Sequence, residues 1–384
     1  MDMVYKILGN LKPAALATHA NRFFVPLVLQ LHNDKDSVCK EKCSAALSNL
    51  LKRVNVETAK DFYGTIKAWE GAAETRIVGL KMLGLVCESR PKFVKDGRRG
   101  EVEELMRGNV KAEVQEEGRW GENWERVYFG LIGLEKLAPA GPAVAREEVV
   151  KALRHFHPWC KLVAGRIVLG ALKKKGMKGV ESDSYELVRG FGAQIDCDEK
   201  FTNEDIALSA IRGVTATVSL MKEGDEDAMK AKKWLFSRLA GASTKSAGGV
   251  RMRVFKCFAS LMTVCDVGPF LGLVLGSLHR AVSEAEATNN ESEENVTFVK
   301  ELIALLEDKV GTEMFMDAYA KVRGKAREKK EARKTEIAAE KVRDPAKAAQ
   351  RKEAKKEKER DRKKRRFEEK KSSGGFRAKQ KRKY

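Results

Sequence analysis

Residues 23–54 read FFVPLVLQLHNDKDSVCKEKCSAALSNLLKRV, and this stretch decides the fold. An apolar run containing Pro26 leads into a polar turn, and a second run follows in which apolar residues recur every three or four positions. That spacing predicts two helices packed against each other. Asp34 is predicted to cap the second helix, and Leu47 and Leu50 are predicted to be buried between helix pairs. The arrangement is typical of a HEAT repeat.

The same two-helix pattern returns along the chain at intervals of roughly 35–50 residues. The further helices are predicted at residues 62–69, 76–86, 124–137, 149–156, 159–172, 206–221, 231–239, 250–265 and 269–282. The segments between them that are rich in Gly, Asp, Glu and Ser are predicted loops, at 97–118, 173–200 and 283–294. Such units cannot bury their apolar faces alone and must stack. The sequence therefore predicts an all-α fold, an α-solenoid of about seven HEAT-like helix pairs over residues 1–311.

Two stretches invite a different interpretation, and both are better explained by helices. Residues 250–258 alternate briefly like a strand, but Phe255 and Phe258 also fit helical spacing, as their neighbours do. Residues 259–278 contain a single charged side chain, as a membrane span would. Gly268 and Pro269 lie at the middle of that stretch, where one helix would end and another begin. We therefore expect two packed helices and no membrane partner.

The charge of the chain is concentrated at one end. The whole sequence has 75 Lys and Arg and 55 Asp and Glu, of which residues 321–384 hold 29 and 11. The first 320 residues therefore hold 46 and 44, a balance close to neutral. This distribution excludes a uniformly basic globule and predicts a nearly neutral body with a cationic tail. Such tails most often bind nucleic acid, and less often anionic membranes or acidic proteins.

The junction between body and tail carries an apolar stripe. After Thr312, a predicted helix cap, the stripe consists of Met314, Phe315, Ala318, Tyr319 and Val322, and it is predicted to dock on the end of the solenoid. Asp344 and Pro345 then predict a helix restart. We divide the chain into a solenoid at 1–311, a docking helix running into a basic helix at 312–344, and a basic tail at 345–384.

The basic tail is predicted to be a solvated helix up to about residue 371. Glu359 with Lys363, and Asp361 with Arg365, form favourable pairs four residues apart. Few aromatic residues lie among the cations, which predicts contacts to phosphates rather than stacking on specific bases. The candidate RNA-binding residues are Lys352, Lys355, Lys356, Lys358, Arg360, Arg362, Lys363, Lys364, Arg365, Arg366, Lys379, Lys381, Arg382 and Lys383. The alternative is a solvated charged helix without a function.

Four consecutive cations are also typical of a nuclear import signal, which makes an import receptor a further candidate partner. They are Lys363, Lys364, Arg365 and Arg366.

Three stretches of the sequence resemble one family. They are FFVPLVLQLHND at 23–34, HFHPWCKLVAGRIVLGAL at 155–172, and residues 305–366, with VGTE, a basic run and then DPAKAA. In content and order these resemble the C-terminal end of the U3 small nucleolar RNA-associated protein 20 family, whose members are several times longer. The resemblance implies a nucleolar, non-enzymatic HEAT-repeat component of the small-subunit processome. Its implied partners are pre-ribosomal RNA and processome proteins, and its implied role is support of 18S ribosomal RNA maturation.

Other motifs predict no active site and no cofactor. His155, His157 and Cys160 could supply three metal ligands, but Pro158 and Trp159 interpose and no fourth ligand lies nearby. Residues 241–246, GASTKS, lack the glycine that a phosphate-binding loop places before its lysine. Seven cysteines without a CxxC pair indicate buried thiols in a reducing compartment. We predict a protein that is not an enzyme and binds no small-molecule substrate.

Two other functions stay open at this point. A HEAT-type transport or adaptor protein would bind acidic or peptide partners, although the nearly neutral body is unlike an import receptor's strongly charged inner surface. An RNA-processing enzyme is disfavoured because the sequence has no HExxH, GxSxG or GxGxxG motif.

Overall fold

The structure is a computed structural model of the chain. It describes all residues except 1, 34, 115–118, 138–144, 196–203, 246–248, 289–292, 347–348, 355, 358, 362, 365–367 and 369–384. The chain forms two compact units, Met1–Phe315 and Met316–Tyr384.

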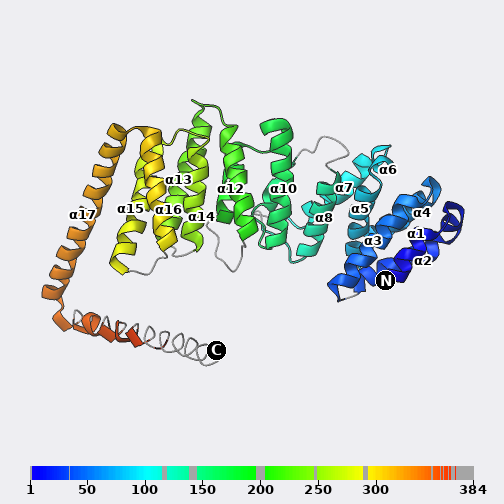
Figure 1. Ribbon diagram of the computed structural model, residues 1–384, viewed down its shortest axis with the longest axis horizontal. Coiled ribbons are helices and arrows are strands. Elements are labelled where there is room, and N and C mark those ends of the chain that lie inside the picture. The colour runs from blue at the N-terminus through cyan, green and yellow to red at the C-terminus, as the bar shows by residue number, and fades with distance from the viewer. Residues whose placement is uncertain are drawn as a thin grey trace, which may run out of the picture. The chain divides into compact units, whose positions relative to one another are not determined.

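The first unit is built from helix pairs (Figure 1). The first helices of the pairs are α2 (Pro13–Asn33), α4 (Val56–Gly71), α7 (Arg99–Ala112), α9 (Glu147–Ala152), α11 (Ser184–Ile195), α13 (Glu226–Lys245) and α15 (Leu271–Thr288). Their partners are α3 (Ser37–Arg53), α5 (Arg76–Ser89), α8 (Trp124–Leu137), α10 (Pro158–Lys175), α12 (Glu204–Ser219), α14 (Gly249–Met262) and α16 (Glu293–Val310). The described residues also include α1 (Asp2–Asn10), α6 (Pro91–Lys95), α17 (Thr312–Arg343) and the short 3₁₀ helices η3 (Gly176–Gly179) and η5 (Gly268–Phe270). First helices of consecutive pairs start 37 to 48 residues apart, as the sequence predicted.

The pairs stack in two layers. The second helices pack in series, α3 on α5, then α8, α10, α12, α14 and α16. The first helices from α7 to α15 pack in a parallel series, each against the next. Among the described residues there is no strand, only two isolated bridges. Each pair thus buries its apolar face against its neighbours, and the all-α solenoid is confirmed.

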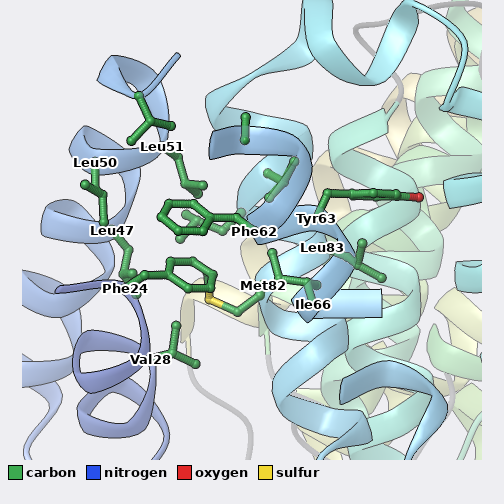
Figure 2. Close-up of a cluster of buried hydrophobic side chains, with 14 of the residues drawn as sticks. Phe24, Val28, Leu47, Leu50, Leu51, Phe62, Tyr63, Ile66, Met82 and Leu83 are labelled. Carbon is green, nitrogen blue, oxygen red and sulfur yellow. The ribbon is translucent and has the colours of Figure 1, made fainter. Parts of the chain in front are cut away.

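The first three pairs share one apolar core (Figure 2). Phe24 of α2 stacks on Phe62 of α4 with ring centroids 4.0 Å apart. Leu47 and Leu50 of α3 are buried beside them, with exposed fractions of 0% and 1%. Pro26 lies inside α2. The predicted burial of Leu47 and Leu50 between helix pairs is confirmed.

The cap of α3 differs from the prediction. Asp36, not Asp34, is the N-cap, and its carboxylate accepts a hydrogen bond of 3.1 Å from the backbone N–H of Val38. Asp36 directly precedes the first helical residue, which is the position from which a side chain reaches the free N–H groups. Asp34 lies outside the described residues.

Two predicted loops contain whole helices, and the third, 283–294, overlaps the end of α15 at Thr288 and the start of α16 at Glu293. Helix α7 lies within 97–118, and its buried Val102, Met106 and Val110 recur every four residues among charged neighbours. Helix α11 lies within 173–200, where Gly190 faces the side chain of Leu153 so closely that a Cβ atom would lie 2.9 Å from it. Glycine there permits close packing and does not mark a turn. Composition concealed both helices.

Helix α9 is shorter than the predicted 149–156, because it ends at Ala152. His157 precedes Pro158 and has extended backbone angles, which a residue before proline favours. The predicted break at 259–278 is confirmed, since α14 ends at Met262 and η5 precedes α15. No helix in the described part of the chain is long and apolar enough to cross a membrane.

Candidate nucleic-acid interface

Helix α17 starts the cationic region of the chain. Gly311 precedes it with φ of +85°, a conformation that glycine adopts readily, and donates its N–H to the carbonyl of Glu307 at the end of α16. Thr312 is therefore the first helical residue rather than the predicted cap. Of the predicted apolar stripe, Phe315 is buried and Ala318, Tyr319 and Val322 are half-buried. Met314 is exposed and does not belong to a buried stripe.

Beyond the stripe, α17 is a solvated charged helix. It carries ten Lys and Arg against six Asp and Glu. Lys321 pairs with Asp317 at 3.8 Å and Arg327 with Glu331 at 3.2 Å, both four residues apart. Exposed pairs of this kind stabilise a helix by only about 0.3–0.5 kcal/mol each. Most cations of α17 are therefore available at the surface.

Helical backbone resumes at Pro345, as the sequence predicted, and every described residue from there to Glu368 is helical and exposed. Arg351 pairs with Glu340 of α17. Lys363 pairs with Glu359 at 3.7 Å, which confirms one predicted pair. The other predicted pair, Asp361 with Arg365, involves a residue outside the described part of the chain.

Five of the fourteen candidate RNA-binding residues fall within the described chain. Lys352, Lys356, Arg360, Lys363 and Lys364 are all helical and exposed. The other nine lie outside it, and they are Lys355, Lys358, Arg362, Arg365, Arg366, Lys379, Lys381, Arg382 and Lys383.

The spacing of the described cations groups them on one side of the helix. Lys352, Lys356, Arg360 and Lys364 follow one another at intervals of four, so each lies about 6 Å further along the helix at 1.5 Å per residue. Three acidic residues, Glu353, Glu357 and Asp361, form the adjoining line, while Glu359 pairs with Lys363. The helix therefore has a cationic side. The four-residue interval in the sequence indicates this side, whereas a count of charges does not.

The candidate metal ligands have structural roles. His155 is fully buried, and its Nδ1 accepts the backbone N–H of His157 at 2.9 Å. Burial lowers the pKa of His155 to about 4. The ring of His157 stacks on Trp124 with centroids 3.8 Å apart, and the thiol of Cys160 donates to the carbonyl of Trp124 at 3.5 Å. These contacts join α8 to the start of α10.

No other candidate for chemistry emerges from the described residues. They hold no cluster of three His, Cys, Asp or Glu side chains suited to a metal ion. Residues 241–245 of the GASTKS stretch form the end of α13 rather than a loop, and Ser246 lies outside the described chain. Hydrogen bonds from Ser243 and Thr244 to the carbonyls three residues earlier engage their hydroxyl groups within the helix.

Comparison with known proteins agrees with the sequence motifs. Residues 160–369, more than half of the chain, match the family model described as Small subunit processome component 20 homolog, C-terminal. The chain is also similar to U3 small nucleolar RNA-associated protein 20 of Schizosaccharomyces pombe, with 22% identity over 91% of this chain. The matched region is 15% of that relative's length. The resemblance predicted from the motifs is confirmed.

Proposed function

Because the chain belongs to the family of small subunit processome component 20 homologues, matched at their C-terminal region, we propose that it acts in the small-subunit processome. Its role is that of a non-enzymatic scaffold in ribosome biogenesis, which supports pre-ribosomal RNA processing and 18S ribosomal RNA maturation. The observation that carries this proposal is the family match, which covers both the solenoid's second half and most of the basic region. An enzyme would need a site that neither the motifs nor the described side chains supply.

The body contacts processome proteins in this proposal. A solenoid offers two long layers of helices as surface, and each repeat can contact a different neighbour. The first 320 residues are nearly neutral, which suits protein partners of mixed charge better than a polyanion. The division into a solenoid at 1–311, a docking helix at 312–344 and a tail at 345–384 assigns a separate task to each segment.

The tail contacts pre-ribosomal RNA. Residues 321–384 hold 29 Lys and Arg against 11 Asp and Glu, and 19 and 6 of these lie in the tail, an excess beyond what ion pairing along a helix requires. Cations that neutralise phosphates release condensed counterions, and this gain needs no base-specific geometry. The exposed line of Lys352, Lys356, Arg360 and Lys364 suits a phosphate backbone.

Nucleolar localisation follows from import and retention together. Lys363, Lys364, Arg365 and Arg366 are the proposed site for an import receptor, and RNA binding would retain the protein in the nucleolus. Neither step requires a membrane or a small-molecule ligand.

Co-sedimentation tests the proposal. The full chain, tagged and expressed in cells that assemble the small-subunit processome, should sediment with pre-ribosomal RNA at about 0.15 M salt. This association should persist after a moderate increase in salt because of the chain's protein contacts. A chain that sediments only with free proteins, or with import receptors, would instead support the transport or adaptor function.

A further inference from the structure

The body contains one strongly cationic segment. Residues 228–265 carry eight Lys and Arg and no Asp or Glu, within a body that is otherwise slightly acidic. These residues form most of α13 and all of α14. An acid-free run of this length stands out in a chain in which 55 of 384 residues are acidic. It marks one helix pair as the place where the body can attract a polyanion.

Some of this charge serves the fold. Arg251 is buried, donates to the carbonyl of Ser243 at 3.0 Å and pairs with Glu284 at 2.7 Å. Lys256 pairs with Glu204 at 3.5 Å. Among the described side chains of α13, the exposed cations are Lys230, Lys233 and Arg238, and Lys230 pairs with Asp227 one turn earlier. Lys233 and Arg238 thus lie exposed beyond the acidic first turn of the helix.

Aromatic rings lie beside Arg238. Trp234 of α13 contacts Tyr185 of α11, with centroids 6.1 Å apart and planes inclined by 69°. The guanidinium of Arg238 lies 5.2 Å from the Trp234 ring and that of Arg189 lies 5.7 Å from the Tyr185 ring. Both residues are half-buried, so each is held in place and remains partly accessible to solvent.

Packing fixes the position of the indole. Gly192 of α11 faces Trp234, and a Cβ atom there would lie 3.3 Å from the ring. Glycine therefore makes room for the ring between the two helices. We call Tyr185, Arg189, Trp234 and Arg238 the α11–α13 patch.

Stabilisation of the helix explains each ring–cation pair, but it does not explain why the rings of the two pairs are in contact. An aromatic residue followed four positions later by Arg is favourable on any helix, and Tyr319 with Arg323 shows the same pair on α17. In the α11–α13 patch two such pairs from neighbouring repeats bring their rings into contact, beside an acid-free cationic helix. Glu186 is the adjoining carboxylate, and it binds both Arg154 at 3.2 Å and Arg189 at 2.9 Å. Two guanidinium groups outweigh its charge.

We propose that the α11–α13 patch binds a short single-stranded RNA segment. Bases stack on Trp234 and Tyr185, while Arg189 and Arg238 neutralise the adjacent phosphates. An acidic peptide would satisfy the cations but would leave the rings without a planar partner, so RNA fits both features. This inference rests on the proposed function and adds a second RNA contact, on the body, to that of the tail.

Tryptophan fluorescence in the full chain tests the stacking. Titration with a ten-nucleotide oligouridylate should quench the emission of Trp234, because bases stacked on an indole quench it. Trp234→Phe should bind the RNA within about threefold of the wild type but lose most of the quenching. Trp159→Phe is the control, since Trp159 is exposed and lies outside the patch. Equal quenching in wild type and Trp234→Phe would overturn the proposal.

Charge variants test the phosphate contacts. Arg189→Gln combined with Arg238→Gln should reduce the slope of log K against log salt by about 1.4, at 0.7 per phosphate. Arg212→Gln combined with Arg280→Gln removes the same charge from exposed positions elsewhere on the body and should leave the slope unchanged. Equal changes in the two double variants would contradict a specific patch.

The experiments distinguish a failure of RNA binding by the patch from a failure of RNA binding by the tail. If the tail does not bind RNA, quenching of Trp234 persists while the overall salt slope is small. If the patch does not bind RNA, the slope stays large and quenching does not depend on Trp234. Quenching by polyglutamate but not by oligouridylate would assign the patch to an acidic protein and overturn the RNA proposal.

Discussion

Replacing Leu50 by Asp should unfold much of the solenoid. Leu50 is 1% exposed within the core shared by the first three helix pairs. The substitution removes the free energy gained by burying a leucine side chain, about 1.5–3 kcal/mol. It also places a carboxylate in a core whose described residues include no cation that could pair with it. Because an unpaired buried charge costs at least as much again, we expect a loss of about 4 kcal/mol or more. Domains commonly have only about 5–15 kcal/mol of stability.

The matched control lies in the same helix. Val38 is 54% exposed in the first turn of α3, where an acidic side chain interacts favourably with the helix dipole. Val38→Asp should therefore change the free energy of unfolding by less than about 0.5 kcal/mol. Urea unfolding followed by far-ultraviolet circular dichroism measures both variants against the wild type. If the urea midpoint of unfolding of Leu50→Asp is as close to that of the wild type as the midpoint of Val38→Asp is, the repeat packing is refuted.

The pH dependence of Leu50→Asp provides an internal check. Burial raises the folded-state pKa of the new carboxyl group above its unfolded value of about 3.9. The penalty is then fully present above the raised pKa, decreases as the pH falls, and is lost below about pH 3.9, where the group is neutral in both states. The difference in the free energy of unfolding between Leu50→Asp and the wild type should decrease as the pH falls.

Three further predictions rest on individual contacts and charges. Burial lowers the pKa of His155 to about 4 in the folded state, so stability that is present above pH 6.5 should decline by up to about 3 kcal/mol as the pH falls from 6.5 to 4. A His155→Gln variant that keeps this decline in calorimetry would contradict the assignment. Gly213→Ala should destabilise by about 1–3 kcal/mol because its Cβ would overlap the Phe191 ring, whereas Gly170→Ala, with open space, should stabilise by up to about 1 kcal/mol. Similar melting shifts would disprove the close packing of α11 on α12. Replacing Lys363, Lys364, Arg365 and Arg366 by Ala should reduce nuclear accumulation of a tagged chain, and undiminished nucleolar fluorescence would remove the import role.

The sequence predicts the fold best where apolar spacing and turn residues agree. Helix α8 spans the predicted 124–137, with its apolar residues regularly spaced. Helices α7 and α11 were missed because charge in one and glycine in the other resemble loop composition. In α7 the buried apolar residues form a narrow line of Val102, Met106 and Val110, and such a line is weaker evidence than a broad apolar face.

The candidate site was only partly predictable. Net charge located the tail, since electrostatic attraction depends on the sum of charges and not on their exact positions. The α11–α13 patch depends on contact between Tyr185 and Trp234, which are 49 positions apart in the sequence and meet only because α11 packs on α13. The spacing of residues within one helix cannot predict a contact between residues of two different helices.

The division of labour between body and tail is tested most directly with naked RNA. The full chain and a chain ending at Tyr319 should be titrated with a pre-ribosomal RNA fragment at two salt concentrations. If the tail neutralises about 6–8 phosphates, log K for the full chain should fall against log salt with a slope of about −4 to −7. The shortened chain keeps a nearly neutral body and should bind much more weakly, through the patch alone. Equal affinities, or a slope near zero for the full chain, would contradict the account.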